Sequence, residues 1–152
     1  MGIKHLYKMI QLYAPDAISN HNLSDLKGTT VVIDLSLYVH RFNAVQGHSF
    51  TGLFHQINLL KENNITPIYV FDGEYPDEKM STMKERKQII QNNNKKFENL
   101  KEKKATKSEL FKAKNRAFRI DDAEVKFCKK LFDLLGVPWL QAKGEADILM
   151  AN

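Results

Sequence analysis

Four carboxylate side chains follow short apolar runs of the sequence. Asp34 and Asp72 come directly after runs of β-branched and aromatic residues, and Glu145 and Asp147 lie shortly after a third run. In a parallel sheet the carboxyl ends of the strands share one edge, where ligands bind, so these side chains would meet there. Carboxylates that converge without cationic partners repel one another, and oxygen ligands of this kind suit Mg²⁺ or Mn²⁺. The set predicts two-metal hydrolysis of a phosphodiester.

Each carboxylate taken alone has a simpler explanation. An aspartate before a helix is commonly an N-cap, and Asp72 with Gly73 forms a common turn pair. We favour the metal site over caps and turns only because the four residues occur as a set behind three strands.

The elements that must position these carboxylates follow from the hydropathy pattern. Each of three short runs is β-branched or aromatic and is followed by a turn or helix signal, which is typical of a buried strand. Strands that alternate with helices predict an α/β fold with a parallel sheet covered by helices on both faces. The expected strands are 29–33, 66–71 and 137–140, and the expected helices are 3–13, 35–42, 50–63 and 122–135.

The helix expected over 122–135 has the clearest boundaries. Asp121 or Asp122 can cap its start, and Gly136 can end it. Cys128 falls in its apolar stripe, so we interpret this residue as a small buried hydrophobe.

Composition excludes several classes of protein. The chain has 152 residues, which favours a single domain, and its single cysteine cannot form an internal disulfide, which suits a reducing compartment. No apolar run approaches the roughly 20 residues of a membrane span, and the start lacks a secretory apolar region. We therefore expect a protein that is neither secreted nor embedded in a membrane.

The charge is unevenly distributed. Residues 79–119 hold 14 basic and four acidic residues, whereas the remainder holds 9 basic and 14 acidic residues. The segment 78–119 also has too few apolar residues for a core element, so we expect basic helices that project from the domain. Such a segment is typical of a phosphate-backbone binder, which we favour slightly over a merely solvated helical face.

Four motifs in order resemble the flap endonucleases. They are Met-Gly-Ile-Lys at the start, Val-Ile-Asp-Leu-Ser at 32–36, Tyr-Val-Phe-Asp-Gly at 69–73 and Gly-Glu-Ala-Asp at 144–147. These enzymes are structure-specific 5′ nucleases and include the exonuclease-one and xeroderma-pigmentosum-G types. The resemblance implies a PIN-like α/β fold and Mg²⁺-dependent cleavage, with two ions that Mn²⁺ can replace. It also implies 5′-flapped or branched DNA, or another single-strand/double-strand junction, as substrate in replication, repair or recombination.

The resemblance assigns roles to individual residues. Asp34, Asp72, Glu145 and Asp147 match its metal ligands, although Asp147 stands where the family more often has glutamate, which is one methylene longer. The segment 78–119 corresponds to the helical arch, or gateway, through which the 5′ strand passes.

The basic side chains expected to touch DNA cluster at the start of this segment. Lys79 and Arg86 match the catalytic basic pair that stabilises charge on the scissile phosphate, and their spacing of seven puts them on one helix face. We expect Lys84 and Lys87 to contact DNA as well.

Two further residues are expected to contact DNA. His40 stands where relatives place an aromatic that stacks on a base, which we favour slightly over a histidine satisfied within its own helix. Gly2, once Met1 is removed, would leave a small amino terminus near the metals.

The sequence departs from the family pattern in two ways. Gln46 and Gln56 lie where relatives usually place arginines that grip duplex phosphates. The chain also stops at Asn152, before the remaining acidic ligands, so we expect 1–152 to be an incomplete amino-terminal nuclease domain that cleaves poorly alone. A sliding-clamp contact would lie in the missing part, and we expect a nuclear protein, or a cytoplasmic one if the source is a large DNA virus.

Two alternatives remain open. The same fold could act on RNA, since similar carboxylate sites serve ribonucleases. The basic segment could also make the chain a nucleic-acid-binding module without catalysis, which predicts salt-sensitive binding that is indifferent to Mg²⁺.

Overall fold

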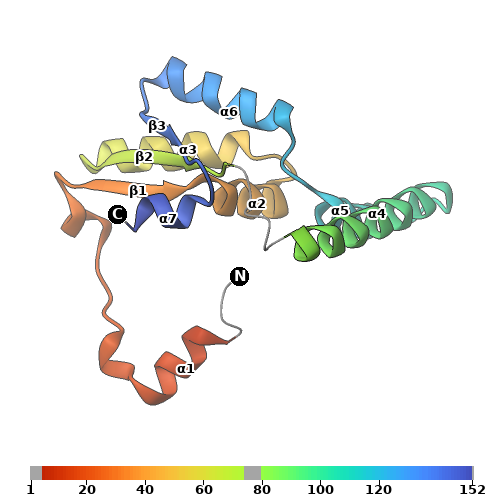
Figure 1. The fold of residues 1–152 in the computed structure, drawn as a ribbon, viewed down its shortest axis with the longest axis horizontal. Helices are drawn as coiled ribbons and strands as arrows, with labels where there is room; N and C mark the ends of the chain where they lie inside the picture. The colour runs from red at the N-terminus through yellow and green to blue at the C-terminus, as the bar shows by residue number, and fades with distance from the viewer. Residues whose placement is uncertain (1–4, 74–79, 152) are drawn as a thin grey trace.

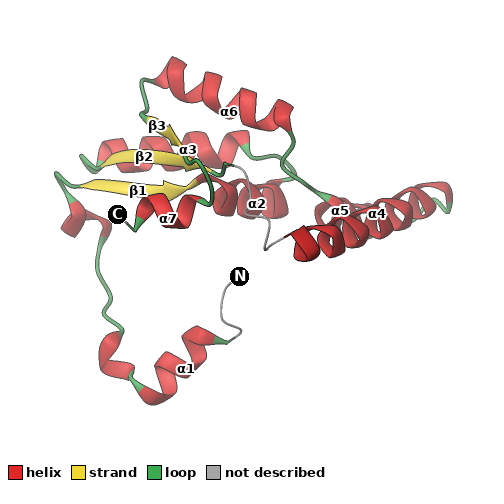
Figure 2. Cartoon of the chain, viewed as in Figure 1, coloured by secondary structure: helices red, strands yellow, loops and turns green. Residues whose placement is uncertain are grey.

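The computed structural model describes residues 5–73 and 80–151, and a parallel sheet lies at its centre (Figures 1 and 2). The strands are β1 (Thr30–Asp34), β2 (Thr66–Phe71) and β3 (Trp139–Gln141). β2 lies between the other two strands, and Asp34 at the end of β1 is in register with Val70 near the end of β2. Since all three strands are parallel, their carboxyl ends share one edge, as the sequence predicts.

Helices cover both faces of this sheet or extend away from it. They are α1 (Leu6–Tyr13), α2 (Leu35–Gln46), α3 (Phe50–Glu62), α4 (Met80–Glu102), α5 (Lys107–Ala117), α6 (Asp122–Leu135) and α7 (Ala146–Met150), with the 3₁₀ turns η1 (Pro15–Ala17) and η2 (Leu23–Leu26) before β1. β2 and α6 span the residues predicted for them, whereas β3 begins two residues later than predicted. The late start of β3 follows from Pro138, which has no amide hydrogen to donate to β2. Only its carbonyl takes part, and it accepts from Tyr69 N at 3.1 Å.

The main core lies on one face of the sheet. Ile33, Tyr69 and Phe71 point from the strands toward α3 and α6, and all three are buried. Phe132 of α6 stacks on Tyr69 with ring centroids 4.4 Å apart. The other buried apolar members of this core are Leu35, Val39, Leu53, Ile57, Leu60, Ile65, Cys128, Leu131 and Val137.

The opposite face of the sheet is more open. Val70 packs there with Ala142 and Ala146, so the short helix α7 covers its centre (Figure 1). Val32 and Leu140 remain 48% and 49% exposed on the flanking strands. The predicted parallel sheet with helices on both faces is therefore confirmed, with unequal cover on the two sides.

α6 confirms the predicted boundaries in detail. The Asp121 side chain accepts from Glu124 N at 2.8 Å and caps the start, and Gly136, with a φ of 60°, ends the helix. Cys128 is fully buried, and this burial, followed by the charge of Glu124, raises the pKa of its thiol to about 12. The residue is therefore a packing group, as predicted.

α4 and α5 form the projecting basic helices that the sequence predicts (Figure 1). Asn93 Nδ2 of α4 donates to Arg116 O of α5 at 3.0 Å, which ties the two helices together. Thr106 and Glu109 form a capping box at the start of α5, and these hydrogen bonds lower the pKa of Glu109. We call α4 and α5 together the basic hairpin.

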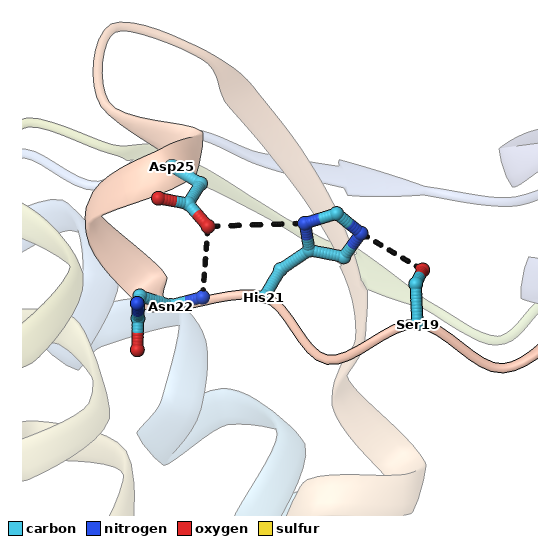
Figure 3. A network of polar contacts seen from close by, with 4 residues as sticks. All are labelled: Ser19, His21, Asn22 and Asp25. Carbon is cyan, nitrogen blue, oxygen red and sulfur yellow. Dashed lines mark hydrogen bonds and ion pairs between the residues drawn. The ribbon is translucent and has the colours of Figure 1, made fainter.

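The segment before β1 is held by local polar contacts (Figure 3). Ser19 Oγ lies 2.8 Å from His21 Nε2, and Asp25 Oδ2 accepts from Asn22 N at 2.9 Å. His21 Nδ1 and Asp25 Oδ2 are 3.8 Å apart, which is too long for a hydrogen bond, and the groups are exposed. The contacts shape the turn that leads into η2 and do not form a catalytic triad.

α1 precedes this segment and stands apart from the sheet (Figure 1). It contains no buried residue, and its apolar side chains other than that of Ile10, among them Leu12 and Tyr13, are exposed. Within the described ranges, no helix combines the length and the apolarity needed to cross a membrane.

Candidate functional site

Asp34 and Asp72 stand at the carboxyl edge of the sheet, where their strands end. Asp34 is also the N-cap of α2, and its Oδ1 accepts from Leu37 N at 3.3 Å. The simpler explanation of this aspartate as a cap is therefore correct, and capping uses only part of the acceptor capacity of its two carboxylate oxygens.

Asp72 joins the starts of two helices. Its Oδ2 accepts from Ser36 Oγ of α2 at 2.7 Å, and its Oδ1 accepts from Ala146 N of α7 at 3.0 Å. Ser36 was not among the predicted site residues, although it lies only two positions after Asp34. A carboxylate held at both oxygens has one fixed orientation at the sheet edge.

The loop after β2 lies directly against the loop after β3. Gly73 N donates to Gly144 O at 2.6 Å, and Gln141 Nε2 donates to Asp72 O at 2.6 Å. A Cβ atom at Gly73 would lie 2.1 Å from Ala142 O, so only glycine permits this approach. The close contact brings the start of α7, which carries two predicted ligands, beside Asp72.

The carboxylates at this edge influence one another. Burial raises the pKa of Asp34 most, and the negative charges of Asp72 and Asp147 raise it further, while hydrogen bonds from the backbone of Leu37 and Ser36 oppose the rise. Three of the four predicted ligands therefore share one electrostatic environment. Glu145, the fourth, is the half-buried N-cap of α7, adjacent to Ala146.

The negative charges of these carboxylates favour a hard cation more clearly than their spacing does. Among the described side chains, no three histidine, cysteine, aspartate or glutamate residues gather closely enough to form a metal cluster. The repulsion that raises the pKa of Asp34 is, however, the energy that a bound divalent cation would remove. Metal binding by Asp34, Asp72, Glu145 and Asp147 stays a prediction.

The raised pKa of Asp34 makes a stability prediction. In EDTA and near neutral pH, we expect Asp34→Asn to raise the unfolding temperature by a few degrees. The contribution of Asp34 to the free energy of unfolding is fully present below its ordinary pKa of 3.8. It is lost as the pH rises through the higher pKa that Asp34 has in the folded state. Asparagine still accepts from Leu37 N but cannot ionise.

Thermal unfolding followed by circular dichroism at about pH 3 and about pH 7 measures this effect. The increase in unfolding temperature should be present at the higher pH and absent at the lower pH. Asp16→Asn, at an exposed position in η1, is the matched control and should change neither temperature. An unfolding temperature lowered by Asp34→Asn at the higher pH would contradict the prediction.

A cavity of about 480 Å³ opens beside Asp72. His40, Lys87 and Arg119 supply its basic groups, from α2, from α4 and from the segment after α5. Its remaining lining residues are Leu35, Ser36, Phe71, Gly73, Ile89, Ile90, Phe118, Ile120 and Val125. Arg119 was not among the predicted site residues, and the only sequence signal for it was its place at the end of the basic segment.

His40 lies at this cavity with its ring against an aromatic neighbour. The rings of His40 and Phe118 meet edge to face, with centroids 5.4 Å apart and an interplanar angle of 83°. Burial lowers the pKa of His40, and the charge of Asp34 partly opposes this change. The ring is therefore mainly neutral at pH 7 and still partly exposed, as a stacking surface requires.

The other predicted DNA contacts have different outcomes. Lys87 is exposed on α4 and lines the cavity. Gly2 and Lys79 lie outside the described residues, and so do the side chains of Lys84 and Arg86, so their roles stay predictions.

One of the two glutamines at which the sequence departs from the expected arginines bonds to a core residue. Gln56 Oε1 accepts from the Tyr69 hydroxyl at 3.0 Å. Tyr69 is fully buried, and this burial raises its pKa, so its hydroxyl stays protonated and needs an acceptor. Gln56 therefore supplies the acceptor for a buried hydroxyl of the core.

Comparison with known families and proteins agrees with this arrangement. Residues 1–93 match the family described as the XPG N-terminal domain. Flap endonuclease 1 of Ajellomyces capsulatus (strain NAm1 / WU24) is 33% identical over 161 residues, which cover 97% of this chain and 40% of the relative. Flap endonuclease 1 of Lodderomyces elongisporus is 31% identical over 167 residues, which cover 100% of this chain and 43% of the relative. The chain thus spans about two fifths of the length of these relatives.

Solved structures share the fold. The catalytic core of Rad2 in complex with DNA substrate aligns with a TM-score of 0.63 and 22% identity, covering 95% of this chain and 38% of that one. Human GEN1 in complex with Holliday junction DNA aligns with a TM-score of 0.62 and 20% identity, covering 99% of this chain and 33% of that one.

Proposed function

The chain belongs to the family of the XPG N-terminal domain, and from this premise we propose that it is the nuclease region of a metal-dependent, structure-specific 5′ nuclease. Its substrate is DNA with a 5′ flap, a branch or another single-strand/double-strand junction. The observation that carries the proposal is the placement of Asp34 and Asp72 at one sheet edge, beside a cavity with basic walls. The relatives named flap endonuclease 1 and the DNA complexes of Rad2 and GEN1 support the choice of substrate.

The carboxylates would hold the metal. We assign Asp34 and Asp72 to one Mg²⁺ ion, and Glu145 and Asp147 to the same or a second ion, with Mn²⁺ as a substitute. When bound, such ions polarise the phosphodiester and lower the pKa of water. Asp72 contributes orientation as well as charge, because Ser36 and Ala146 hold both of its oxygens.

Basic and aromatic groups would position the DNA strand. Lys87 and Arg119 at the cavity wall bind phosphate oxygens, and the arginine can do so with two parallel hydrogen bonds. The His40 ring stacks on a base, which contributes about 1–3 kcal/mol per base in comparable sites. We keep Lys79 and Arg86 as the pair that stabilises charge on the scissile phosphate, and Gly2 and Lys84 as further contacts.

The basic hairpin would guide the 5′ strand. Residues 79–119 carry 14 of the 23 lysines and arginines of the chain. Such a concentration of positive charge attracts phosphates and makes binding salt-dependent. We propose a role in DNA replication, repair or recombination, in the nucleus or in the cytoplasm of a cell infected by a large DNA virus.

A cleavage assay with matched substrates tests the proposal. The protein is incubated with a 5′-flap DNA, with the same flap made of RNA and with plain duplex, each with Mg²⁺ and with EDTA. We expect cleavage of the DNA flap with Mg²⁺ only, and weak cleavage where residues 1–152 are tested alone. Preference for the RNA flap would show that RNA is the substrate in place of DNA. Equal cutting of plain duplex would show that the cleavage is not structure-specific.

A second candidate function is nucleic-acid binding without cleavage. The lack of a three-residue metal cluster among the described side chains favours it. It predicts that the protein binds the flap with equal affinity in Mg²⁺ and in EDTA. It also predicts that this affinity stays independent of Mg²⁺ in Asp34→Asn. Against it stand the carboxylates at the sheet edge, of which Asp34 and Asp72 are half-buried, since negative charge that faces phosphate weakens a pure binder.

A further inference from the structure

α2 and α5 meet along a seam of three contacts. His40 touches Phe118, Ala44 touches Asn115 and Gly47 touches Phe111. On each helix the contacting positions are spaced by three or four residues, so each set forms one helix face. Rising numbers on α2 pair with falling numbers on α5, so the two chain segments run antiparallel. We call these six residues the α2–α5 seam.

The central contact completes the end of α2. The last carbonyls of a helix lack partners within the helix. Asn43 O accepts from Gly47 N at 2.8 Å, and Ala44 O accepts from Asn115 Nδ2 at 2.8 Å. A side chain of α5 thus supplies a hydrogen bond that α2 cannot make for itself.

The outer contacts of the seam are close as well. Gly47 ends α2 with a φ of 78°, and a Cβ atom there would lie 3.2 Å from Phe111 Cε2. At the other end, the edge-to-face contact of Phe118 limits rotation of the His40 ring.

The seam extends to α4 through α5. Asn93 of α4 bonds to Arg116 O, next to Asn115, and Lys87 of α4 lines the same cavity as His40. A shift of α5 against α2 would therefore move both the His40 ring and a basic wall of the cavity.

We propose that Phe118 and Asn115 are positioning residues that hold the His40 ring at the cavity and fix where the basic hairpin stands relative to Asp72. Phe118 acts through His40, and Asn115 acts through the carbonyl at the end of α2. That this position serves DNA rests on the proposed function, whereas the seam itself can be tested without DNA.

Histidine NMR tests the first half of the proposal. The protein has five histidines, so His40→Gln assigns the His40 ring signals. We expect Phe118→Ala to shift these signals, because the ring current of Phe118 is lost, and Phe118→Tyr to restore them. Phe127→Ala is the matched control, because Phe127 makes a similar edge contact with Phe50, at 5.8 Å, away from the seam. Unchanged His40 signals in Phe118→Ala, or an equal shift in the control, would overturn the assignment.

Amide hydrogen exchange tests the second half. Asn115→Asp keeps the shape of the side chain but removes the N–H that donates to Ala44 O. We expect amides of α5 to exchange at least about fivefold faster, because one hydrogen bond is lost and a carboxylate oxygen then faces Ala44 O, with α6 unchanged. Asn94→Asp makes the same charge change at an exposed position of α4 and should leave α5 protected. Unchanged exchange in Asn115→Asp would show that Asn115 does not hold the hairpin.

Measurements of flap binding distinguish a purely structural role of the α2–α5 seam from a role in DNA binding. If the seam variants give the expected NMR and exchange changes, and Phe118→Ala weakens flap binding as much as His40→Gln does, both proposals stand. If the spectral changes occur while no seam variant affects flap binding, the seam is structural and the positioning role fails. Because both physical measurements are made without metal or DNA, they test the seam whether or not the protein cleaves DNA.

Discussion

Asp72→Asn is expected to reduce Mg²⁺-dependent cleavage of a 5′-flap DNA by about a thousandfold, the scale on which single charge-stabilising groups act in enzymes. The substitution removes one negative charge from the predicted metal site. It also replaces one carboxylate oxygen with an amide nitrogen, so Ser36 Oγ and Ala146 N cannot both donate to it as they do to Asp72. Single-turnover cleavage rates at saturating Mg²⁺ measure the effect.

Two controls make the Asp72 result interpretable. Asp16→Asn removes the same charge at an exposed position and should cut at the rate of the unchanged protein. Mn²⁺ binding followed by calorimetry should weaken in Asp72→Asn and stay unaltered in the control. Cleavage within threefold of the unchanged protein (a tolerance of about 0.7 kcal/mol) would remove Asp72 from the mechanism.

Phe132→Ala is expected to destabilise the fold by about 3–5 kcal/mol, the usual range for a buried phenylalanine. The ring is fully buried, stacks on Tyr69 at 4.4 Å and meets Phe71 at 6.0 Å. Removing it leaves a cavity between α6 and the sheet that neighbouring side chains cannot fill without moving. Since domains have total stabilities of about 5–15 kcal/mol, this loss is a large fraction of the whole free energy of unfolding.

The same substitution elsewhere on α6 is the control for the core prediction. Phe127 is 44% exposed, so Phe127→Ala removes much less buried contact. Urea unfolding of both variants gives the two free energies of unfolding. A loss for Phe132→Ala no larger than that for Phe127→Ala would show that the α6–sheet contact is not the centre of the core.

Much of the architecture is a local property of the sequence. The run 66–71 alternates β-branched residues with proline and aromatic residues, and β2 occupies it in full. α6 begins at its Asp121 cap and ends before Gly136, because capping and left-handed backbone depend on neighbouring residues alone. The order of strands and helices then brings Asp34 and Asp72 to one edge, since parallel strands end on the same side.

The tertiary structure was needed wherever a side chain had a choice of partners. Gln56 could have faced solvent or the core, and the buried hydroxyl of Tyr69 decided for the core. Arg119 is one of many basic residues in its segment, and only packing of the chain after α5 places it at the cavity. Ser36 and Ala146 hold Asp72 although one lies 36 and the other 74 positions away. Composition and periodicity determine which elements form and where they end, because those are short-range effects, whereas contacts between distant residues exist only once the elements have packed.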